Sequence, residues 1–514
     1  MSKTIIIIGA GLAGLSAALQ AAENGCNVKL VSSFPSERAQ SVMAEGGINA
    51  ALNTKDENDS PEEHFTDTIK AACGLADPNA VWGMTQAAPE LVHWLLKLGV
   101  QFNMSGYDDV DLRNFGGQKK KRTAFAQSDT GKQIMTAMID AVRRKEASGM
   151  VERFSHHSFL TLRLCDNICC GCVIRDEYSQ ETVELPGDAV IVATGGMHGL
   201  FGNTTGSLSN TGEVTAELFR LGVPLANGEM IQYHPTTVKC GGKRMLISEA
   251  ARGEGGRLFA MKDGKQWYFM EEKYPELGNL MPRDITAREI WKVSHESEVF
   301  LDMTEISDEI ISNKLSGLAD DCMTYLHKDI RKEPVSVLPG IHYFMGGILV
   351  DEQHRTPIQN LYAAGECCAQ YHGANRLGGN SLLGALYGGR VAAKSACEQA
   401  DVVDLSCATQ IDFPPASQIS EIKQLNKVMQ ETMGVVRNEN TLLNGIQTVQ
   451  ALTENLPLLG MAVLKSALAR KESRGAHWRE DYPKSNDDDY LKTTVARFDG
   501  KQIQISFVPV PERW

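Results

Sequence analysis

A glycine-rich turn near the start of the sequence has the residue types and spacing that bind a pyrophosphate. Gly9 allows a tight turn, Gly11 lets the backbone approach a phosphate, and Gly14 lets the following helix pack against the preceding strand. The N-terminus of that helix directs unpaired N–H groups at the phosphate. The whole segment, assigned to cofactor binding, is Gly9, Ala10, Gly11, Leu12, Ala13 and Gly14. It predicts a dinucleotide site, with either FAD or NAD as the ligand.

The second predicted strand, residues 27–31, ends without the acidic residue that often binds a ribose. Ser32 and Ser33 occupy that position, and their hydroxyl groups can bond a ribose without a carboxylate. We therefore add both serines to the predicted cofactor site.

Further motifs, in fixed order over nearly the whole chain, resemble those of the succinate dehydrogenase/fumarate reductase flavoprotein family. They lie at residues 38–48, 234–236, 248–256, 282–284, 342–347, 364–366, 372–382 and 470–477. The resemblance implies FAD as cofactor. It also implies an α/β fold, in which a Rossmann-like FAD-binding domain carries an inserted α+β capping domain and is followed by a C-terminal helical domain.

The resemblance extends the predicted FAD site beyond the glycine turn. Glu213 stands where the family commonly has Asp. The implied contacts are Arg38, Gln40, Ser41, Glu45, Gly46, Gly47, Ala193, Thr194, Gly195, Glu213, Glu366, His372, Ser381 and Leu382.

A substrate clamp is implied in the same way. A dicarboxylate such as fumarate or succinate needs cations and hydrogen-bond donors at both ends. The resemblance assigns His234, His342 and Arg376 to this clamp, with Ser248 in place of the usual Thr. A guanidinium can pair with a carboxylate through two hydrogen bonds, which makes Arg376 the predicted anchor.

The resemblance also assigns the proton transfer. Fumarate reduction delivers a hydride from flavin N5 to one alkene carbon and a proton to the other. Arg283 resembles the family's proton donor, and it needs a relay because a guanidinium stays charged. Glu249 and Arg252, three residues apart, can share one helical face and form that relay.

Two positions bear on the direction of the reaction. Gln40 stands where membrane-bound members carry a histidine that binds the flavin covalently, so we predict non-covalent FAD. Glu45 is typical of fumarate reductases, whereas succinate dehydrogenases commonly have Gln there, and it would place an anion beside the flavin. We therefore favour fumarate reductase over succinate dehydrogenase. Two further hypotheses are L-aspartate oxidase, a sister family with non-covalent flavin, and a non-catalytic assembly role.

The elements that must position these residues alternate between strands and helices. Apolar strand patterns occur at residues 5–8, 27–31, 189–193 and 360–364, and helical periodicity at 60–100 and 130–147. We predict the FAD-binding domain at 1–230 and 344–402, the capping domain at 231–343, helices at 416–478, and a tail at 479–514. A linker with Pro414 and Pro415 precedes the helices.

Composition limits the partners and the compartment. The 51 Lys and Arg against 64 Asp and Glu give a net charge of −13, which argues against a nucleic-acid partner. No apolar run is long enough for a membrane helix, and no secretory signal is recognised. The 12 cysteines include a CxxC, Cys169 to Cys172, in an alternating strand pattern rather than at a helix start. We expect a cytoplasmic protein.

The chain has no haem-attachment motif, no ferredoxin-type cysteine run and no predicted metal site. Electron exchange with a distant donor then requires another subunit. The resemblance implies an iron–sulfur subunit as that partner, and a membrane anchor subunit would hold the complex at the inner face of the cell membrane.

Overall fold

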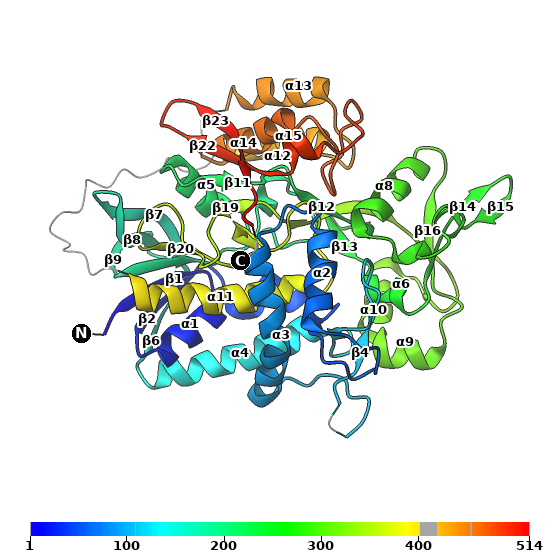
Figure 1. Ribbon diagram of the computed structural model, residues 1–514, viewed down its shortest axis with the longest axis horizontal. Helices are drawn as coiled ribbons and strands as arrows, with labels where there is room; N and C mark the ends of the chain where they lie inside the picture. Colours follow the sequence, from blue (N-terminus) through cyan, green and yellow to red (C-terminus); the bar gives the residue numbers. More distant parts are fainter. Residues whose placement is uncertain (1, 108, 401–418, 453–454, 513–514) are drawn as a thin grey trace.

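The computed structural model describes residues 2–107, 109–400, 419–452 and 455–512. Its central element is a five-stranded parallel sheet in the order β20-β10-β1-β2-β6 (Figure 1). The strands are β1 (Thr4–Ile8), β2 (Asn27–Ser32), β6 (Val151–Ser155), β10 (Ala189–Val192) and β20 (Leu361–Ala363). Strands from three distant parts of the chain thus form one sheet, which confirms the predicted α/β fold.

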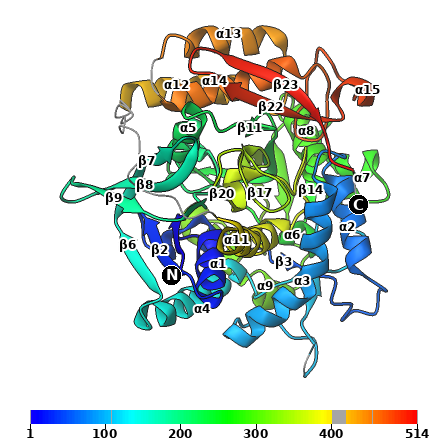
Figure 2. The same ribbon diagram turned by 60° about the vertical axis from the view of Figure 1, so that its left-hand side comes forward.

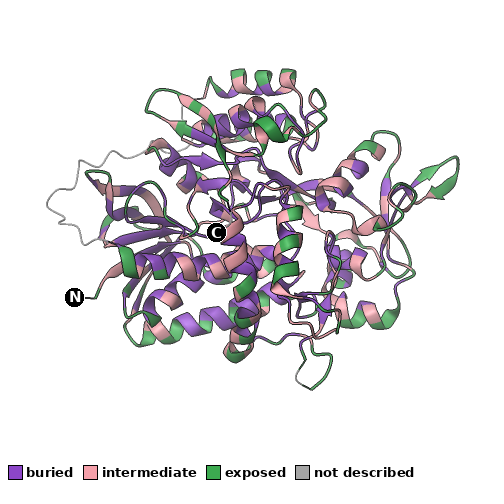
Figure 3. Cartoon of the chain, in the orientation of Figure 1, coloured by how far each residue is buried: buried purple, intermediate pink, exposed green. Residues whose placement is uncertain are grey.

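The two faces of β1 are both covered, as its uninterrupted run of isoleucines requires. Ile5 and Ile7 pack with helices α1 (Leu12–Glu23), α4 (Thr130–Ala147) and α11 (Asn380–Gln399). Ile6 and Ile8 pack on the opposite face with strands β7 (His157–Cys165) and β8 (Ile168–Asp176). Figure 3 shows the resulting buried layer through the sheet and its helices.

The layer opposite the helices is a three-stranded antiparallel sheet, β7-β8-β9. Its strands are β7 (His157–Cys165), β8 (Ile168–Asp176) and β9 (Thr182–Pro186). Cys169 and Cys172 both lie in β8, and burial raises the pKa of each thiol above its usual value. The alternating pattern therefore predicted the strand correctly, and a low-pKa redox thiol has no support here.

The region between β11 (Leu225–Ala226) and β19 (Gly347–Leu349) contains two antiparallel sheets and short helices, on the right in Figure 1. One sheet comprises β12 (Ile231–Cys240), β13 (Lys243–Leu246) and β18 (Leu338–Phe344). The other comprises β14 (Arg257–Lys262), β15 (Lys265–Trp267), β16 (Val299–Asp302) and β17 (Val335–Ser336). The helices are α6 (Glu249–Gly253), α7 (Phe269–Lys273), α8 (Arg283–Val293), α9 (Asp308–Lys314) and α10 (Ser316–Asp321).

The C-terminal part combines helices with a hairpin, at the top of Figures 1 and 2. The elements are α12 (Ile419–Thr432), α13 (Glu439–Val449), α14 (Asn455–Ala469), α15 (Asp487–Tyr490), β22 (Lys492–Phe498) and β23 (Ile503–Pro509). The hairpin extends the sheet β21-β19-β11-β22-β23, whose strand β21 is Cys368–Ala369. The tail therefore belongs to a sheet of the main body.

Of the remaining helices and strands, α5 (Glu213–Arg220) lies beside β11 in the upper part of Figure 1, and the others lie in its central and lower part. The others are β3 (Ile48–Asn49), α2 (Pro61–Ala71), α3 (Pro78–Leu98), β4 (Leu112–Arg113) and β5 (Thr123–Ala124). The predicted domain limits at residues 402 and 416 and the linker with Pro414 and Pro415 lie outside the described residues.

Candidate active site

A cavity of about 1800 Å³ lies between the carboxyl ends of β1, β2 and β10 and the region that contains β12 and α6. Ligand pockets usually hold about 300–1,000 Å³, so this cavity has room for a dinucleotide and a small second ligand. The predicted residues that line it are Gly9, Ala10, Gly11, Leu12, Ala13, Ser32, Ser33, Arg38, Gln40, Ser41, Glu45, Gly46, Gly47, Ala193, Thr194, Gly195, Glu213, His234, Ser248, Glu249, Arg283, His342, Glu366, Arg376, Ser381 and Leu382.

The glycine turn leaves space where a phosphate must approach. Gly9 has φ +111°, and a Cβ there would lie 2.3 Å from the carbonyl oxygen of Ala193. A Cβ at Gly14 would lie 1.9 Å from the Gly9 carbonyl oxygen, so Gly14 brings α1 against the turn rather than lining the cavity. A Cβ at Gly11 would lie 3.8 Å from its nearest neighbours, in Ala39 and Ser41, so the cavity side of Gly11 is open. The geometry fits a tight turn at Gly9 and close helix packing at Gly14, and the approach of a phosphate to Gly11 stays a prediction.

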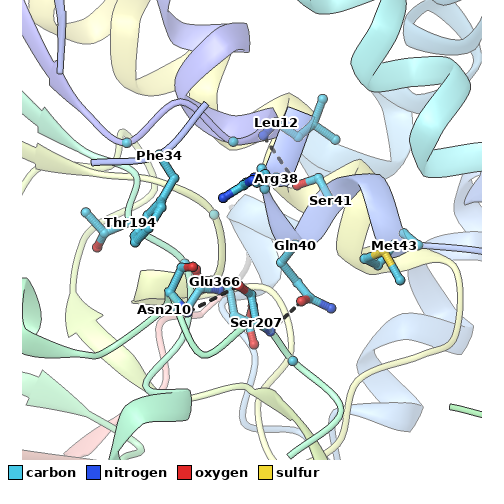
Figure 4. A pocket seen from close by; sticks show the side chains of 18 of the residues that line it. Leu12, Phe34, Arg38, Gln40, Ser41, Met43, Thr194, Ser207, Asn210 and Glu366 are labelled. Carbon is cyan, nitrogen blue, oxygen red and sulfur yellow. Dashed lines mark hydrogen bonds between the residues drawn. The ribbon is translucent and has the colours of Figure 1, made fainter. Parts of the chain in front are cut away.

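Two helices begin at the cavity wall. α1 starts at Leu12, whose backbone N–H donates to the Ser41 hydroxyl oxygen at 3.3 Å (Figure 4). α11 starts at Asn380, next to Ser381 and Leu382. Helix N-termini favour negative charge, so these two starts suit the phosphates and polar atoms of a flavin dinucleotide.

Three residues that line the cavity also have buried polar atoms without a partner among the described residues. The Ser32 hydroxyl, one Glu45 carboxylate oxygen and the Arg376 Nε are such atoms. Because burying polar groups without hydrogen bonds is costly, these atoms fit a site completed by a polar ligand. The glycine turn, the two helix N-termini and these buried polar atoms together fit FAD.

Gln40 points its side chain across the cavity wall toward the loop after β10. Its Oε1 accepts a hydrogen bond from the Ser207 backbone N–H at 2.5 Å (Figure 4). An amide engaged in this way offers no nucleophilic nitrogen of the imidazole kind. Glu366, on the same wall, accepts from the Phe344 N–H at 3.1 Å and has the His198 ring 3.6 Å away.

Glu45 is half-buried at the cavity edge, yet its carboxyl group is poorly solvated. Desolvation by burial, together with the nearby carboxylates of Asp321 and Asp129, raises the pKa of Glu45 to about 8. At pH 7 this side chain is mostly neutral. The expectation of an anionic Glu45 beside the flavin is therefore wrong at that pH, because burial favours the protonated form.

The predicted substrate clamp is assembled from four separate segments. His234 of β12 and His342 of β18 have ring centroids 5.1 Å apart, and His342 Nδ1 lies 2.8 Å from the Thr205 hydroxyl. The Arg376 guanidinium lies over the Tyr343 ring at 4.2 Å. Ser248 caps α6 and accepts from the Ala250 N–H at 3.4 Å.

The two clamp histidines are neutral. Burial, followed by repulsion from Arg283, holds the pKa of both His234 and His342 well below its usual value. Burial and then Arg283 also lower the pKa of Arg376, but only to about 9, so it stays mostly protonated at pH 7. The positive charge of the clamp thus resides on Arg376, and the histidines contribute hydrogen bonds.

The predicted proton relay forms one buried cluster. Glu249 Oε2 accepts from Arg283 Nε at 2.8 Å and from Nη2 at 2.6 Å, while its Oε1 lies 3.3 Å from Arg252 Nη2. Burial alone would raise the pKa of Glu249, but Arg283 and Arg252 together hold it below its usual value. Arg252 lies behind Glu249, outside the cavity lining, as a relay residue should.

His372 also lies outside the cavity lining. Its ring packs edge-on against Tyr343 at 5.3 Å and lies 6.0 Å from the Tyr371 ring. Its predicted contact with FAD has no support in this geometry. Its position instead supports Tyr343, on which Arg376 rests.

Sequence reasoning missed Gln232, which joins the two halves of the site. Its Oε1 accepts from Arg283 Nη1 at 3.1 Å, and its Nε2 donates to the Arg376 carbonyl oxygen at 2.8 Å. Gln232 precedes His234 by two positions in β12, so alternation along a strand places both on one face. That spacing was the available signal.

Comparisons with known proteins agree with this geometry. A model described as an FAD binding domain matches residues 4–382, and one described as the fumarate reductase flavoprotein C-terminus matches residues 452–513. The chain belongs to the succinate dehydrogenase/fumarate reductase flavoprotein family. It therefore binds FAD, and the predicted cofactor and family are confirmed.

The relatives include proteins named as succinate dehydrogenases and proteins named as fumarate reductases. The succinate dehydrogenase flavoprotein subunit of Bacillus subtilis is 39% identical over 96% of this chain and 94% of its own length. The 8-methylmenaquinol:fumarate reductase flavoprotein subunit of Wolinella succinogenes is 32% identical over 97% and 89%. The solved FrdA of E. coli quinol fumarate reductase superposes with a TM-score of 0.90 at 27% identity, covering 99% of this chain and 97% of that one.

Proposed function

We propose that this chain interconverts fumarate and succinate, with fumarate reduction as the favoured direction. The observation that carries the proposal is that the Arg283–Glu249 ion pair and the clamp residues Arg376, His234 and His342 all border one cavity. FAD, when bound, supplies the electron pair at flavin N5. The chain's own residues then have to bind a dicarboxylate, orient it and deliver a proton.

Arg376 is the proposed anchor of one substrate carboxylate. Its Nε has no partner within the described structure, and its charge survives burial, so a carboxylate would complete its hydrogen bonds. The neutral His234 and His342 donate or accept hydrogen bonds at the substrate. Gln232 fixes the backbone that carries Arg376 relative to Arg283.

Arg283 is the proposed proton donor. Its Nε and Nη2 are engaged by Glu249, and its Nη1 donates to Gln232, so the guanidinium is held in one orientation. A proton lost to the substrate can return through Glu249, which Arg252 keeps in contact with the relay. The low pKa of Glu249 lets it pass a proton on without holding it.

Gln40 supports the favoured direction through the cofactor link, and Glu45 supports it only as the residue type that resembles fumarate reductases. Gln40 supports non-covalent FAD, and the absence of a histidyl link lowers flavin potential in this family. Glu45, mostly neutral at pH 7, adds little charge beside the flavin until the pH exceeds about 8. Succinate oxidation is the second candidate because the Bacillus subtilis relative of 39% identity is a succinate dehydrogenase subunit. The names of these relatives do not favour L-aspartate oxidation.

We propose that an iron–sulfur subunit exchanges electrons with the FAD, and that a membrane anchor holds the assembly at the inner face of the cell membrane. The proposal is supported by the relatives' names, which describe flavoprotein subunits and quinol-linked fumarate reductases. In the part of the chain that the structure describes, no helix has the length and apolar character to cross a bilayer.

Three parallel assays test the proposed reaction. Purified FAD-loaded protein is given fumarate with a reduced low-potential dye, succinate with an oxidised dye, and L-aspartate with detection of hydrogen peroxide. We expect turnover of fumarate and succinate, faster with fumarate, and no peroxide from L-aspartate. Peroxide release from L-aspartate without fumarate reduction would contradict the proposal and show that the protein is an L-aspartate oxidase.

A further inference from the structure

One short loop contacts three segments of the candidate site that lie far apart in the sequence. The loop is residues 115–118 (Phe-Gly-Gly-Gln), which we call the bridging loop, between β4 and β5. It contacts Glu249, the turn before Arg283, and the segment that follows Arg376. None of its residues belongs to the predicted site.

The first contact is with the relay. The Gly116 backbone N–H donates to Glu249 Oε1 at 3.1 Å, opposite the oxygen that Arg283 holds. A Cβ on Gly116 would lie 2.4 Å from that same Oε1 and 3.2 Å from the Met281 carbonyl oxygen. Only glycine therefore lets this N–H reach the Glu249 carboxylate. The neighbouring Gly117 N–H donates to the Leu280 carbonyl oxygen at 3.1 Å, which ties the loop to the start of α8.

The second contact is with the anchor. Gln118 is buried, and its Nε2 donates to the Gly378 carbonyl oxygen at 2.9 Å and to Asn49 Oδ1 at 3.2 Å. Asn49 Nδ2 donates to the same Gly378 carbonyl oxygen at 2.7 Å. Two side-chain amides thus fix the backbone two residues beyond Arg376, and a Cβ on Gly378 would lie 3.0 Å from the Phe115 ring.

We propose that the bridging loop is a positioning element that sets the proton relay and the carboxylate anchor relative to each other. Gly116 positions Glu249 through its N–H, and Gln118 positions Arg376 through the Gly378 backbone. The inference rests on the proposed function, since it assigns Glu249 to proton return and Arg376 to carboxylate binding. It predicts that Gly116 controls kcat and that Gln118, two residues further on, controls the affinity for a dicarboxylate.

Gly116→Ala tests the relay arm. The methyl group should displace the Glu249 carboxylate, so kcat for fumarate reduction should fall at least tenfold while KM stays within about twofold. Gly83→Ala is the matched control, because Gly83 lies in α3, outside the cavity lining, and a Cβ there would also be crowded. It would lie 2.3 Å from the Tyr387 hydroxyl oxygen. It should leave kcat and KM unchanged.

Gln118→Met tests the anchor arm. The variant keeps the side-chain length and loses the donors to Gly378, so the dissociation constant for malonate, followed by the visible flavin spectrum, should rise at least tenfold. Gln370→Met is its control, because Gln370 is also buried and donates to the Asp351 carbonyl oxygen at 2.5 Å, outside the cavity lining. It should bind malonate as the wild type does.

A double variant and a crystal structure separate positioning from general damage. Glu249→Asp shortens the carboxylate, so adding Gly116→Ala should cost much less than the product of the two single losses. The structure of Gly116→Ala should show Glu249 no longer paired with Arg283. The inference would be overturned if the kcat loss of the double variant equalled the product of the two single losses. It would also be overturned if Glu249 kept its pairing with Arg283 in the Gly116→Ala structure. A wild type that binds FAD but converts neither fumarate nor succinate would instead overturn the proposed function, while the structure still decides on Gly116.

Discussion

Single residues of the site carry charges that their types alone do not reveal. Arg376 stays mostly cationic at pH 7, while burial keeps His234 and His342 neutral and raises the pKa of Glu45 to about 8. Motifs identified these residues because a motif is defined by residue types and spacing, which the sequence shows directly. Their protonation depends on desolvation and on neighbours brought from other segments, such as Asp321, so it required the structure.

Gln40 leads to a prediction about the cofactor. Because its amide has no nucleophilic ring nitrogen and is bonded to the Ser207 N–H, FAD should be held without a covalent link. Acid precipitation should release all of the flavin into the supernatant, measured by its absorbance. Flavin fluorescence that stays with the denatured protein band would contradict this.

Glu45 leads to a prediction about pH. In the folded protein its pKa is about 8, above the ordinary 4.5, so the folded state retains a proton that the unfolded chain releases. The stability of the cofactor-free wild type relative to Glu45→Gln should therefore fall between about pH 5 and 8 and then level off. With solvent in the cavity allowed for, we expect a change of roughly 1–3 kcal/mol. Urea unfolding at several pH values measures it, and a pH-independent difference would refute it.

At the scale of elements, the sequence predicted the strands and helices that bury long apolar runs. The parallel strands around Ile5–Ile8 and helices such as α1 follow from period and length. The strands β12–β18 were not placed, because β12 mixes polar residues such as Gln232 and His234 with apolar ones and pairs with β18, a segment far along the chain. The bridging loop was missed for a similar reason: its importance comes from contacts with Glu249 and Gly378.

Gly14 leads to a prediction at this scale. Gly14→Ala would place a methyl group 1.9 Å from the Gly9 carbonyl oxygen, so α1 would have to move away from the turn. We expect purified Gly14→Ala to retain less than about a tenth of the wild-type FAD content and to melt at a lower temperature. Gly434→Ala is the control, since its nearest neighbour would be 3.6 Å away. Equal FAD content in both variants would contradict the assigned role of Gly14.

At the scale of the whole molecule, a buried ion network joins the C-terminal part to the main body. Arg470 Nε donates to Glu229 Oε1 at 2.7 Å, Arg470 Nη1 donates to Glu472 Oε1 at 2.7 Å, and the Thr494 hydroxyl of β22 also donates to Glu229. Glu229, Arg470 and Glu472 are all fully buried. The motif at residues 470–477 resembled the family, and the structure gives it this joining role.

Glu229→Gln should weaken that junction. Removing one charge from a buried network leaves the others uncompensated, at a cost of about 3–5 kcal/mol. We expect a lower melting temperature and faster proteolysis near the β22–β23 hairpin, followed by mass spectrometry. Unchanged melting and cleavage would mean that the C-terminal part is held by its apolar contacts alone.

The most direct test of the proposed reaction is fumarate reduction by wild-type protein and by Arg283→Gln and Arg283→Lys, measured together with malonate binding. Arg283 donates a proton only as the reaction proceeds, so its loss should fall on kcat. We expect wild-type turnover, a loss of kcat of about 100-fold or more in both variants, and FAD content and malonate binding close to wild type. Substantial turnover in both variants would contradict the proton-donor role of Arg283 and, with it, the reaction assigned to this cavity.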